Sequence, residues 1–261
     1  MLVVFLPSLT CADTDDVYLR LGANIQDFGY KEFNDQNVLI DREDGLMPGL
    51  LVEFGSQWQD VAGIFRFEFF DGLVDYDGQT QSGIPITTRT DERITNAEVL
   101  VRYDVKSFAS NKVKLEVGLG DRKWRRNILA NNIASSLLEV YRWNYFSVGG
   151  EANIWQRGQW SAGIGVRLLR TIRPRLSLDL AGFDAATLNL GSRNSVRVNF
   201  PIQFVDEAGR EWALEPYWES WRLGRSADQR LTTVGVPTTT IVHEPRSETN
   251  IVGVTVSVRL Q

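Results

Sequence analysis

Arginine, lysine and glutamate recur at every second position in several segments of the chain, and they are the residues that could do chemistry. Eight basic and eight acidic residues share the polar face of these segments: Arg20, Arg66, Arg102, Lys114, Arg122, Arg167, Arg197 and Arg259, and Glu53, Glu68, Glu98, Glu116, Glu139, Glu151, Glu215 and Glu219. Equal numbers of both signs favour an interior network of ion pairs, because an unpaired buried charge costs several kcal/mol. The alternatives are a narrow conducting path and acid–base catalysis by a pair of glutamates, although the spacing selects no particular pair.

The single histidine, His243, lies in the sequence V-H-E-P with Glu244 beside it. Adjacent residues of an extended chain point to opposite sides, so these two do not form a catalytic pair. We therefore expect a surface histidine without a function and no catalytic residue. If the chain were an enzyme, His243 and an acidic residue such as Glu139 would be the first to test.

Two acidic clusters and one basic cluster remain. Asp41, Glu43 and Asp44 form one acidic cluster, and Asp75 and Asp77 form the other. Oxygen ligands of this kind can hold Ca²⁺, but the spacing of a calcium loop is missing, and turns explain both clusters more simply. We expect no metal and no cofactor. The basic cluster consists of Arg122, Lys123, Arg125 and Arg126 around Trp124, and it is either a solvated loop or a site for phosphate groups.

The elements that must position these residues are β-strands. Near the C-terminus, Val254 and Val256 alternate with Thr255 and Ser257, which is typical of a strand between two different environments. The pattern predicts ten strands, at about 16–32, 46–58, 62–76, 94–105, 113–124, 138–155, 159–171, 187–205, 211–223 and 249–260. Short and long connections alternate along the chain. A soluble β-sandwich would also show alternating residues, but it has no reason to sort its loops by length.

Aromatic residues gather beside the short connections. The candidates for an aromatic girdle are Trp58, Trp155, Trp160, Phe204 and Trp212. Such rings favour the interface between membrane and water. The formal net charge of −5 offers no basic surface for nucleic acid.

Residues 1–12 are expected to be a signal peptide, either short or truncated. The stretch is apolar up to Leu9, and the small residues Thr10 and Ala12 fit the positions before a cleavage site. Cleavage after Ala12 would remove Cys11, the only cysteine, and leave residues 13–261 as one domain.

With alternating strands and alternating loop lengths, the chain resembles the small outer-membrane β-barrel proteins of Gram-negative bacteria, over roughly residues 16–260. The resemblance implies an all-β fold, a transmembrane antiparallel up-and-down β-barrel of about 10 strands. It also implies a polar lumen, long extracellular loops and periplasmic termini. Such barrels usually end in an aromatic residue, whereas this chain ends in Leu260 and Gln261. Ten strands match the omptin proteases, but the paired inward aspartates and the Asp–His dyad of that group are not evident.

We therefore expect a monomeric barrel of the outer membrane with a structural or adhesive role, or with ligands that bind to its loops, and we do not expect an enzyme. Its partners are the lipid bilayer and, through the basic residues around Trp124, lipopolysaccharide; nucleic acid is not a partner. One alternative is a narrow porin-like channel for small solutes. The other is an outer-membrane barrel enzyme that acts on lipid or peptide.

Overall fold

A computed structural model describes residues 16–80, 83–108 and 111–260, and the expected signal peptide lies outside them. The long strands are β1 (Asp16–Phe33), β2 (Leu39–Trp58), β3 (Val61–Gln79), β4 (Pro85–Phe108), β5 (Asn111–Ile128), β6 (Leu137–Arg157), β7 (Trp160–Asp179), β11 (Glu211–Leu223) and β14 (Arg246–Leu260). The short strands are β8 (Ala186–Asn189), β9 (Asn194–Asn199), β10 (Ile202–Val205), β12 (Gln229–Thr233) and β13 (Val236–Val242). Within the part of the chain that is described, no helix is long and apolar enough to cross a membrane.

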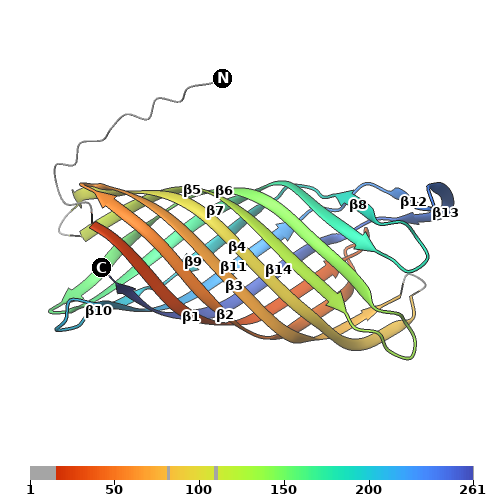
Figure 1. Cartoon of the computed structure of the whole chain (residues 1–261), viewed down its shortest axis with the longest axis horizontal. Helices are drawn as coiled ribbons and strands as arrows, with labels where there is room; N and C mark the ends of the chain where they lie inside the picture. The colour runs from red at the N-terminus through yellow and green to blue at the C-terminus, as the bar shows by residue number, and fades with distance from the viewer. Residues whose placement is uncertain (1–15, 81–82, 109–110, 261) are drawn as a thin grey trace, which may run out of the picture.

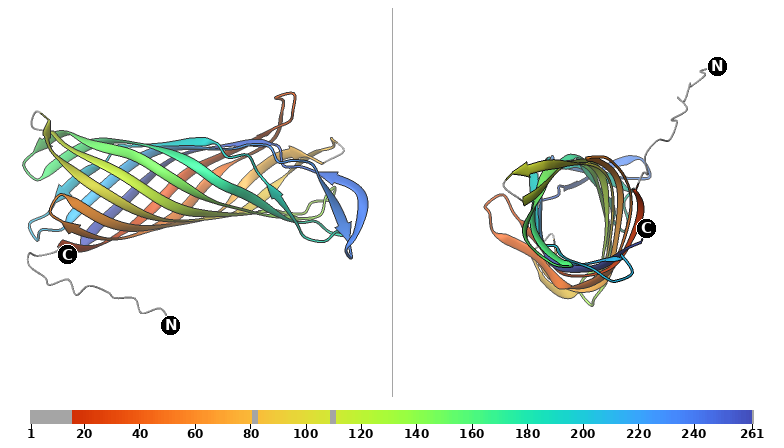
Figure 2. Two further views of the ribbon diagram at one scale, coloured as in Figure 1. Left: turned by 90° about the horizontal axis from the view of Figure 1, so that it is seen from above. Right: turned by 90° about the vertical axis from the view of Figure 1, so that its left-hand side faces the viewer.

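The strands close into one antiparallel ring (Figures 1 and 2). Strands β1 to β7 pair in chain order, and β14 pairs with both β1 and β11. The gap between β7 and β11 is filled by three successive pieces, because β9 and β10 each pair with both neighbours and β8 pairs with β7. Pro201 separates β9 from β10, since proline cannot donate to a sheet ladder. Counting these pieces as one position gives ten, so the predicted all-β barrel of about ten strands is confirmed.

The outward faces of the strands form a continuous apolar band. On β14, the outward residues are the alternate apolar ones from Val252 to Leu260, and on β7 they run from Trp160 to Leu168. These stretches span about nine residues, which is close to the 9–11 that a tilted strand needs to cross the hydrocarbon of a bilayer. Large apolar side chains such as Leu119 and Val99 are exposed in this band, as a lipid-facing surface requires.

The two ends of the barrel differ. The turn end carries the connections 59–60, 158–159 and 206–210 and both ends of the described chain, and the loop end carries the connections 34–38, 129–136, 180–185 and 224–245 (Figure 1). Towards the loop end, the apolar band stops on successive strands at outward polar residues, among them Asp27, Asp44, Asp71, Arg93, Asp121, Asn144, Arg170 and Asn250. Beyond these residues the strands continue outside the membrane.

This continuation corrects several predicted boundaries. Strands β2 to β5 and β7 reach further towards the loop end than the alternation of apolar and polar residues indicated, so the connections there are shorter than expected. The reason is that β-pairing continues where both faces are polar: Asp75 pairs with Arg89, and Asp91 pairs with Asn127. The acidic clusters that were interpreted as turns therefore lie in strands β2 and β3.

The expected girdle residues lie at the turn end of the band. Trp58, Trp155, Trp160 and Trp212 are all exposed on the outer surface. The ring of Trp160 lies 4.7 Å from that of Phe204, its partner on β10. An indole with one apolar and one polar edge suits this level of a bilayer.

The connection 224–245 is itself structured, because β12 and β13 form a hairpin at the loop end. Asp184, from the connection after β7, accepts hydrogen bonds from the hydroxyl of Thr232 (2.6 Å) and from the backbone N–H groups of Val234 (3.0 Å) and Gly235 (2.9 Å). These hydrogen bonds lower the pKa of the Asp184 carboxyl. The hairpin is therefore tied to a neighbouring loop and is not a free extension.

The outward residues of β14 predict that the loss of stability caused by an added charge depends on its position along the strand. Val256 lies in the middle of the apolar band, so Val256→Arg should lower the free energy of unfolding by about 2–4 kcal/mol. Asn250→Arg, on the same strand and the same outward face but beyond the band, should cost less than about 1 kcal/mol. Urea titration of protein refolded into lipid vesicles measures both values, and equal losses would contradict the assigned band.

Candidate functional site

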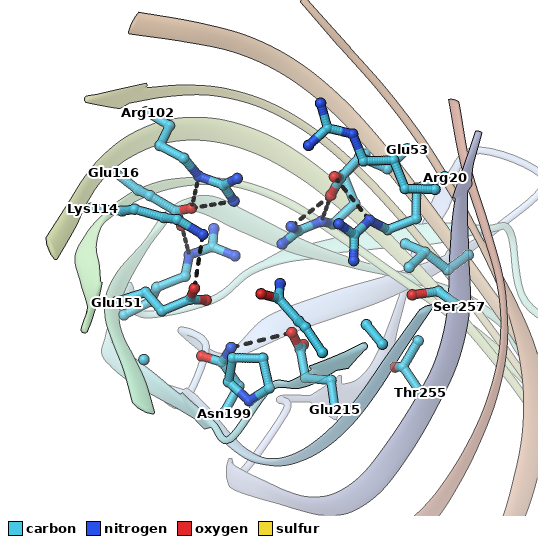
Figure 3. A pocket seen from close by; sticks show the side chains of 18 of the residues that line it. Arg20, Glu53, Arg102, Lys114, Glu116, Glu151, Asn199, Glu215, Thr255 and Ser257 are labelled. Carbon is cyan, nitrogen blue, oxygen red and sulfur yellow. Dashed lines mark hydrogen bonds and ion pairs between the residues drawn. The ribbon is translucent and has the colours of Figure 1, made fainter. Parts of the chain in front are cut away.

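The interior of the barrel at the level of the apolar band is filled by ion pairs (Figure 3). Glu53 accepts hydrogen bonds from Arg66 at 2.9 and 2.7 Å and from the hydroxyl of Tyr18 at 3.0 Å. Arg102 donates to Glu116 at 2.7 Å, beside the pair of Lys114 and Glu151. All sixteen charged residues that were predicted to share the polar face form at least one ion pair.

Several of these pairs span the ring. Arg197 on β9 reaches Glu68 on β3, five positions away in the ring of ten, at 3.4 Å. Arg122 on β5 reaches Glu219 on β11 at 2.8 Å. Arg167 on β7 pairs with Glu98 on β4, and a Cβ atom at Gly149 would lie only 2.6 Å from the Arg167 Cγ atom. The cavity among these side chains measures about 110 Å³, and a further cavity of about 230 Å³ lies towards the turn end beside Lys114 and Glu151.

A second cluster lies above the band, towards the loop end, and Arg126 is its centre. Its guanidinium donates to Glu32 at 2.9 Å, Asp41 at 2.7 Å, Glu43 at 3.0 Å and Glu139 at 2.7 Å. These four carboxyl groups come from β1, β2 and β6, and all of them are buried. One cation therefore faces four acidic groups, so acidic groups are in excess over cations.

Hydroxyl and indole groups satisfy part of this excess. Tyr30 donates to Glu32 at 2.6 Å, Tyr141 donates to Glu244 at 2.7 Å and Thr90 donates to Glu43 at 2.6 Å. Trp124 donates through its indole nitrogen to Glu92. Such hydrogen bonds hold acidic groups where too few cations are present.

A cavity of about 510 Å³ opens above Arg126 towards the loops. We call it the mouth cavity. Its polar lining includes Glu32, Asp41, Arg126, Glu139, His243 and Glu244, and its apolar lining includes Ile40, Ile128, Leu137, Ile241 and Val242. In the described part of the chain, no three His, Cys, Asp or Glu side chains come together as ligands for a metal ion.

Burial controls the acidity of the carboxyl groups around the mouth cavity. Loss of hydration raises the pKa of Glu139 to about 7, against the opposing effect of Arg126. Burial likewise raises the pKa of Asp41, Glu92 and Glu244 well above the ordinary range, and neighbouring acidic groups add to the shift. The cluster therefore holds protons at neutral pH that exposed carboxyl groups would release.

The loop end also brings together a pair that the sequence pattern did not show. His243 Nδ1 lies 3.5 Å from Asp228 Oδ1, because Gln229 and Val242 pair at the base of the hairpin. We expected a surface histidine without a function, and the structure adds that His243 lines the mouth cavity and lies close to Asp228. Only recognition of the β-hairpin formed by β12 and β13 would have brought Asp228 and His243 together from the sequence.

The basic cluster around Trp124 is divided between two faces. Arg122 and Arg126 point into the barrel and are buried, whereas Lys123 and Arg125 point outward. The interpretation of all four as one exposed loop cluster is therefore wrong, since β5 continues to Ile128 and alternates throughout. Glu32, Asp41 and Glu43 were missed as partners of Arg126 for the same reason, and Glu92 and Glu244 were missed as buried acidic groups near it.

Comparisons with known proteins support the fold. No protein-family model matches the chain, and no curated protein matches it. The chain is similar to the outer-membrane protease OmpT of Escherichia coli, with a TM-score of 0.53, 9% identity and coverage of 96% of this chain and 98% of OmpT. The transport unit of the autotransporter AIDA-I from Escherichia coli gives a TM-score of 0.41 at 9% identity and covers 96% of this chain and 92% of that structure. The fold is that of the Gram-negative outer-membrane β-barrels.

The expectation that the chain is not an enzyme needs correction. OmpT, which shares the fold over almost the whole length of both chains, is a protease. A barrel of this fold can therefore accommodate catalysis. The charge-filled lumen does not argue against catalysis, because the mouth cavity lies above the lumen. At 9% identity the similarity concerns the fold and assigns no residue.

Arg126 should dominate the stability of the loop end. Replacing it with methionine leaves several buried carboxyl groups without a cation, so Arg126→Met should lower the free energy of unfolding by about 3–5 kcal/mol. Arg125→Met is the matched control, because the half-exposed Arg125 pairs with Asp91 on the outer wall and should cost less than about 1 kcal/mol. Urea titrations followed by tryptophan fluorescence measure both variants, and similar losses would rule out a central role for Arg126.

The raised pKa of Glu139 predicts a decline of stability with pH. In the folded protein Glu139 keeps its proton up to about pH 7, whereas the unfolded chain releases it near pH 4.5. The stabilisation is therefore complete below pH 4.5 and is lost as the pH rises through 7, by about 2–3 kcal/mol. Glu139→Gln should flatten the dependence between pH 5 and pH 8, and Glu207→Gln in the exposed turn 206–210 should leave it unchanged. An unchanged slope in Glu139→Gln would disprove the assignment.

Proposed function

We propose that this outer-membrane barrel binds positively charged groups, such as lysine and arginine side chains of peptides or polyamines, in the mouth cavity. Its turn end and both termini would face the periplasm, and its loop end would face the exterior. The observation that carries the proposal is the excess of acidic groups over cations in a cavity of about 510 Å³. That volume lies within the range of about 300–1,000 Å³ that is usual for small-molecule sites.

The lining of the mouth cavity suits an organic cation better than a metal ion. Carboxyl groups of Glu139 and Glu244 offer acceptors for an ammonium or guanidinium group. Aliphatic side chains such as Leu137 and Ile241 can bury the methylene stem of such a ligand. The ring of Tyr30 already packs under the Arg126 guanidinium at 4.6 Å, which illustrates how the site accommodates a planar cation.

The filled lumen favours binding at the mouth over passage through the barrel. Ion pairs such as Arg197 with Glu68 span the ring, and each would have to break to open a path for solutes. Balanced charges also give no preference for ions of one sign, which a selective pore would need. These contacts support a closed barrel with its binding site at the loop end.

The proposal predicts charge-selective binding in the mouth cavity. N-acetyl-arginine amide should bind at least about tenfold more tightly than the neutral N-acetyl-citrulline amide in isothermal titration calorimetry. Glu244→Gln should weaken the binding of the arginine ligand by about tenfold or more, because a hydrogen bond to a charged group is worth about 1.5–3 kcal/mol. Binding should tighten between pH 5.5 and pH 8, since the ligand competes with protons on carboxyl groups of raised pKa.

Glu151→Gln provides the control, because Glu151 pairs with Lys114 in the lumen and does not line the mouth cavity. This variant should bind the arginine ligand as the unmodified protein does. Equal affinity for arginine and citrulline ligands would reject the proposed function.

Hydrolysis of a bound peptide is a second candidate, and it is favoured by the pair of Asp228 and His243, because His243 lines the mouth cavity together with Glu139. The Asp228 carboxylate can orient the imidazole of His243, and Glu139 has a pKa near neutral pH. A base and an acid of this kind could activate water against a peptide bond, with the cationic side chain held in the mouth cavity.

The second candidate predicts cleavage of a fluorogenic peptide with a central arginine. His243→Ala and Glu139→Gln should each reduce the rate at least about 100-fold, which is the usual contribution of acid–base catalysis. Asp228→Asn should reduce it less, because Asp228 acts through His243. If cleavage persists in both His243→Ala and Glu139→Gln, the residue assignment fails while the binding proposal stands.

A further inference from the structure

We propose that the outer wall formed by β5, β6 and β7, just beyond the apolar band, binds the phosphate groups of membrane lipids, lipopolysaccharide included. This inference is independent of the mouth cavity, because it concerns side chains on the opposite face of the strands. It rests on a set of exposed cations that have too few acidic partners.

Three of these cations form a row across neighbouring strands. Lys123 on β5 lies directly opposite Arg142 on β6, and Arg142 lies directly opposite Arg175 on β7. All three side chains point outward and are exposed. Like charges that face each other across strands are destabilising, so the row would gain from an anion between its members. Arg170 and Arg173 add two further exposed cations on β7.

The partners on the chain itself do not neutralise this row. Arg142 donates to Asp121 at 3.1 Å. Within the described residues, neither Lys123 nor Arg175 forms an ion pair with an acidic side chain. The group of five cations thus has one acidic partner in direct contact.

The outer wall on the other side of the barrel is different. There, beyond the band, charges of opposite sign pair with each other: Arg93 with Asp71 at 2.7 Å and Arg42 with Asp44 at 2.9 Å. The excess of positive charge is therefore confined to one side of the ring and is not a general property of the strand extensions. A localised excess of this kind indicates a specific anionic partner.

The level of the row identifies this partner as a lipid. Below it, towards the turn end, lie the exposed apolar side chains of Leu119, Phe146 and Leu168. Phe146 pairs directly with Arg170, so an apolar surface passes into a basic one within a single row of the sheet. A lipid has the same order, with acyl chains followed by a phosphate group. Arginine suits phosphate because its guanidinium can donate two parallel hydrogen bonds to the oxygens.

The test compares lipids that remain bound to the full chain after reconstitution. The protein is placed in nanodiscs of phosphatidylcholine with a minor fraction of phosphatidic acid, and the bound lipids are counted by native mass spectrometry. The unmodified protein should retain phosphatidic acid in clear excess over its share of the mixture. The triple variant Lys123→Gln, Arg142→Gln, Arg175→Gln should lose this enrichment about fivefold or more.

A matched triple variant separates a specific site from general attraction. Arg89→Gln, Arg93→Gln and Arg125→Gln remove the same amount of charge from the outer wall of β4 and β5, and this variant should keep the enrichment. Equal loss in both variants, or no enrichment in the unmodified protein, would overturn the proposal. Displacement of the lipid by an equal concentration of inorganic phosphate would also overturn it, because the site would then recognise free phosphate. The β-sheet signal in far-ultraviolet circular dichroism, compared with that of the unmodified protein, checks that each variant is folded.

Discussion

Charges inside a ten-stranded ring must be neutralised by partners on facing walls, and this constraint shapes the molecule. The lumen of so narrow a barrel has room for side chains but little for water. Arg197, Arg122 and Arg167 each reach an acidic residue on a strand that is not a neighbour in the sheet. These pairs connect facing walls of the barrel, and the cavity among them measures about 110 Å³.

The same constraint is only partly met at the loop end, and the candidate function arises there. Around Arg126, acidic groups outnumber the cation, and protons and tyrosine hydroxyls make up the balance. This excess of acidic groups is the basis of the proposed binding of cations in the mouth cavity. On the outside of β5 to β7 the imbalance has the opposite sign, because five exposed cations there have one acidic partner in direct contact. On this side of the ring, the wall beyond the apolar band therefore separates an acidic interior from a basic exterior.

Much of this arrangement could be predicted from the sequence, because the alternation of side chains is a property of the extended backbone. The alternation predicted that residues such as Arg102 and Glu116 point inward, and it predicted the ten strand positions of the barrel. It did not give the ends of the strands at the loop end, where both faces are polar and the contrast between them vanishes. Extending the alternation from Arg122 by four residues would have placed Arg126 in the interior.

Partners across the ring were beyond the sequence pattern. Which carboxyl group meets Arg126 depends on the tilt and register of strands that are far apart in the chain, and Glu32 lies 94 residues away. The pair of Asp228 and His243 depends on the pairing of β12 and β13, which the alternation did not mark. The sequence pattern predicted one long strand where the structure has β8, β9 and β10. Pro201 alone does not show where the hydrogen bonding between strands is interrupted.

The most direct test of this account is the conductance of refolded residues 13–261 in a planar lipid bilayer. If ion pairs across the ring close the lumen, then protein shown to be folded and inserted should give no stable current steps. Weakening one of the pairs, by Arg197→Gln or Glu98→Gln, should then produce small steps or a loss of stability. Stable steps in the unmodified protein would contradict the account, and would identify the barrel as a narrow pore through the charged lumen.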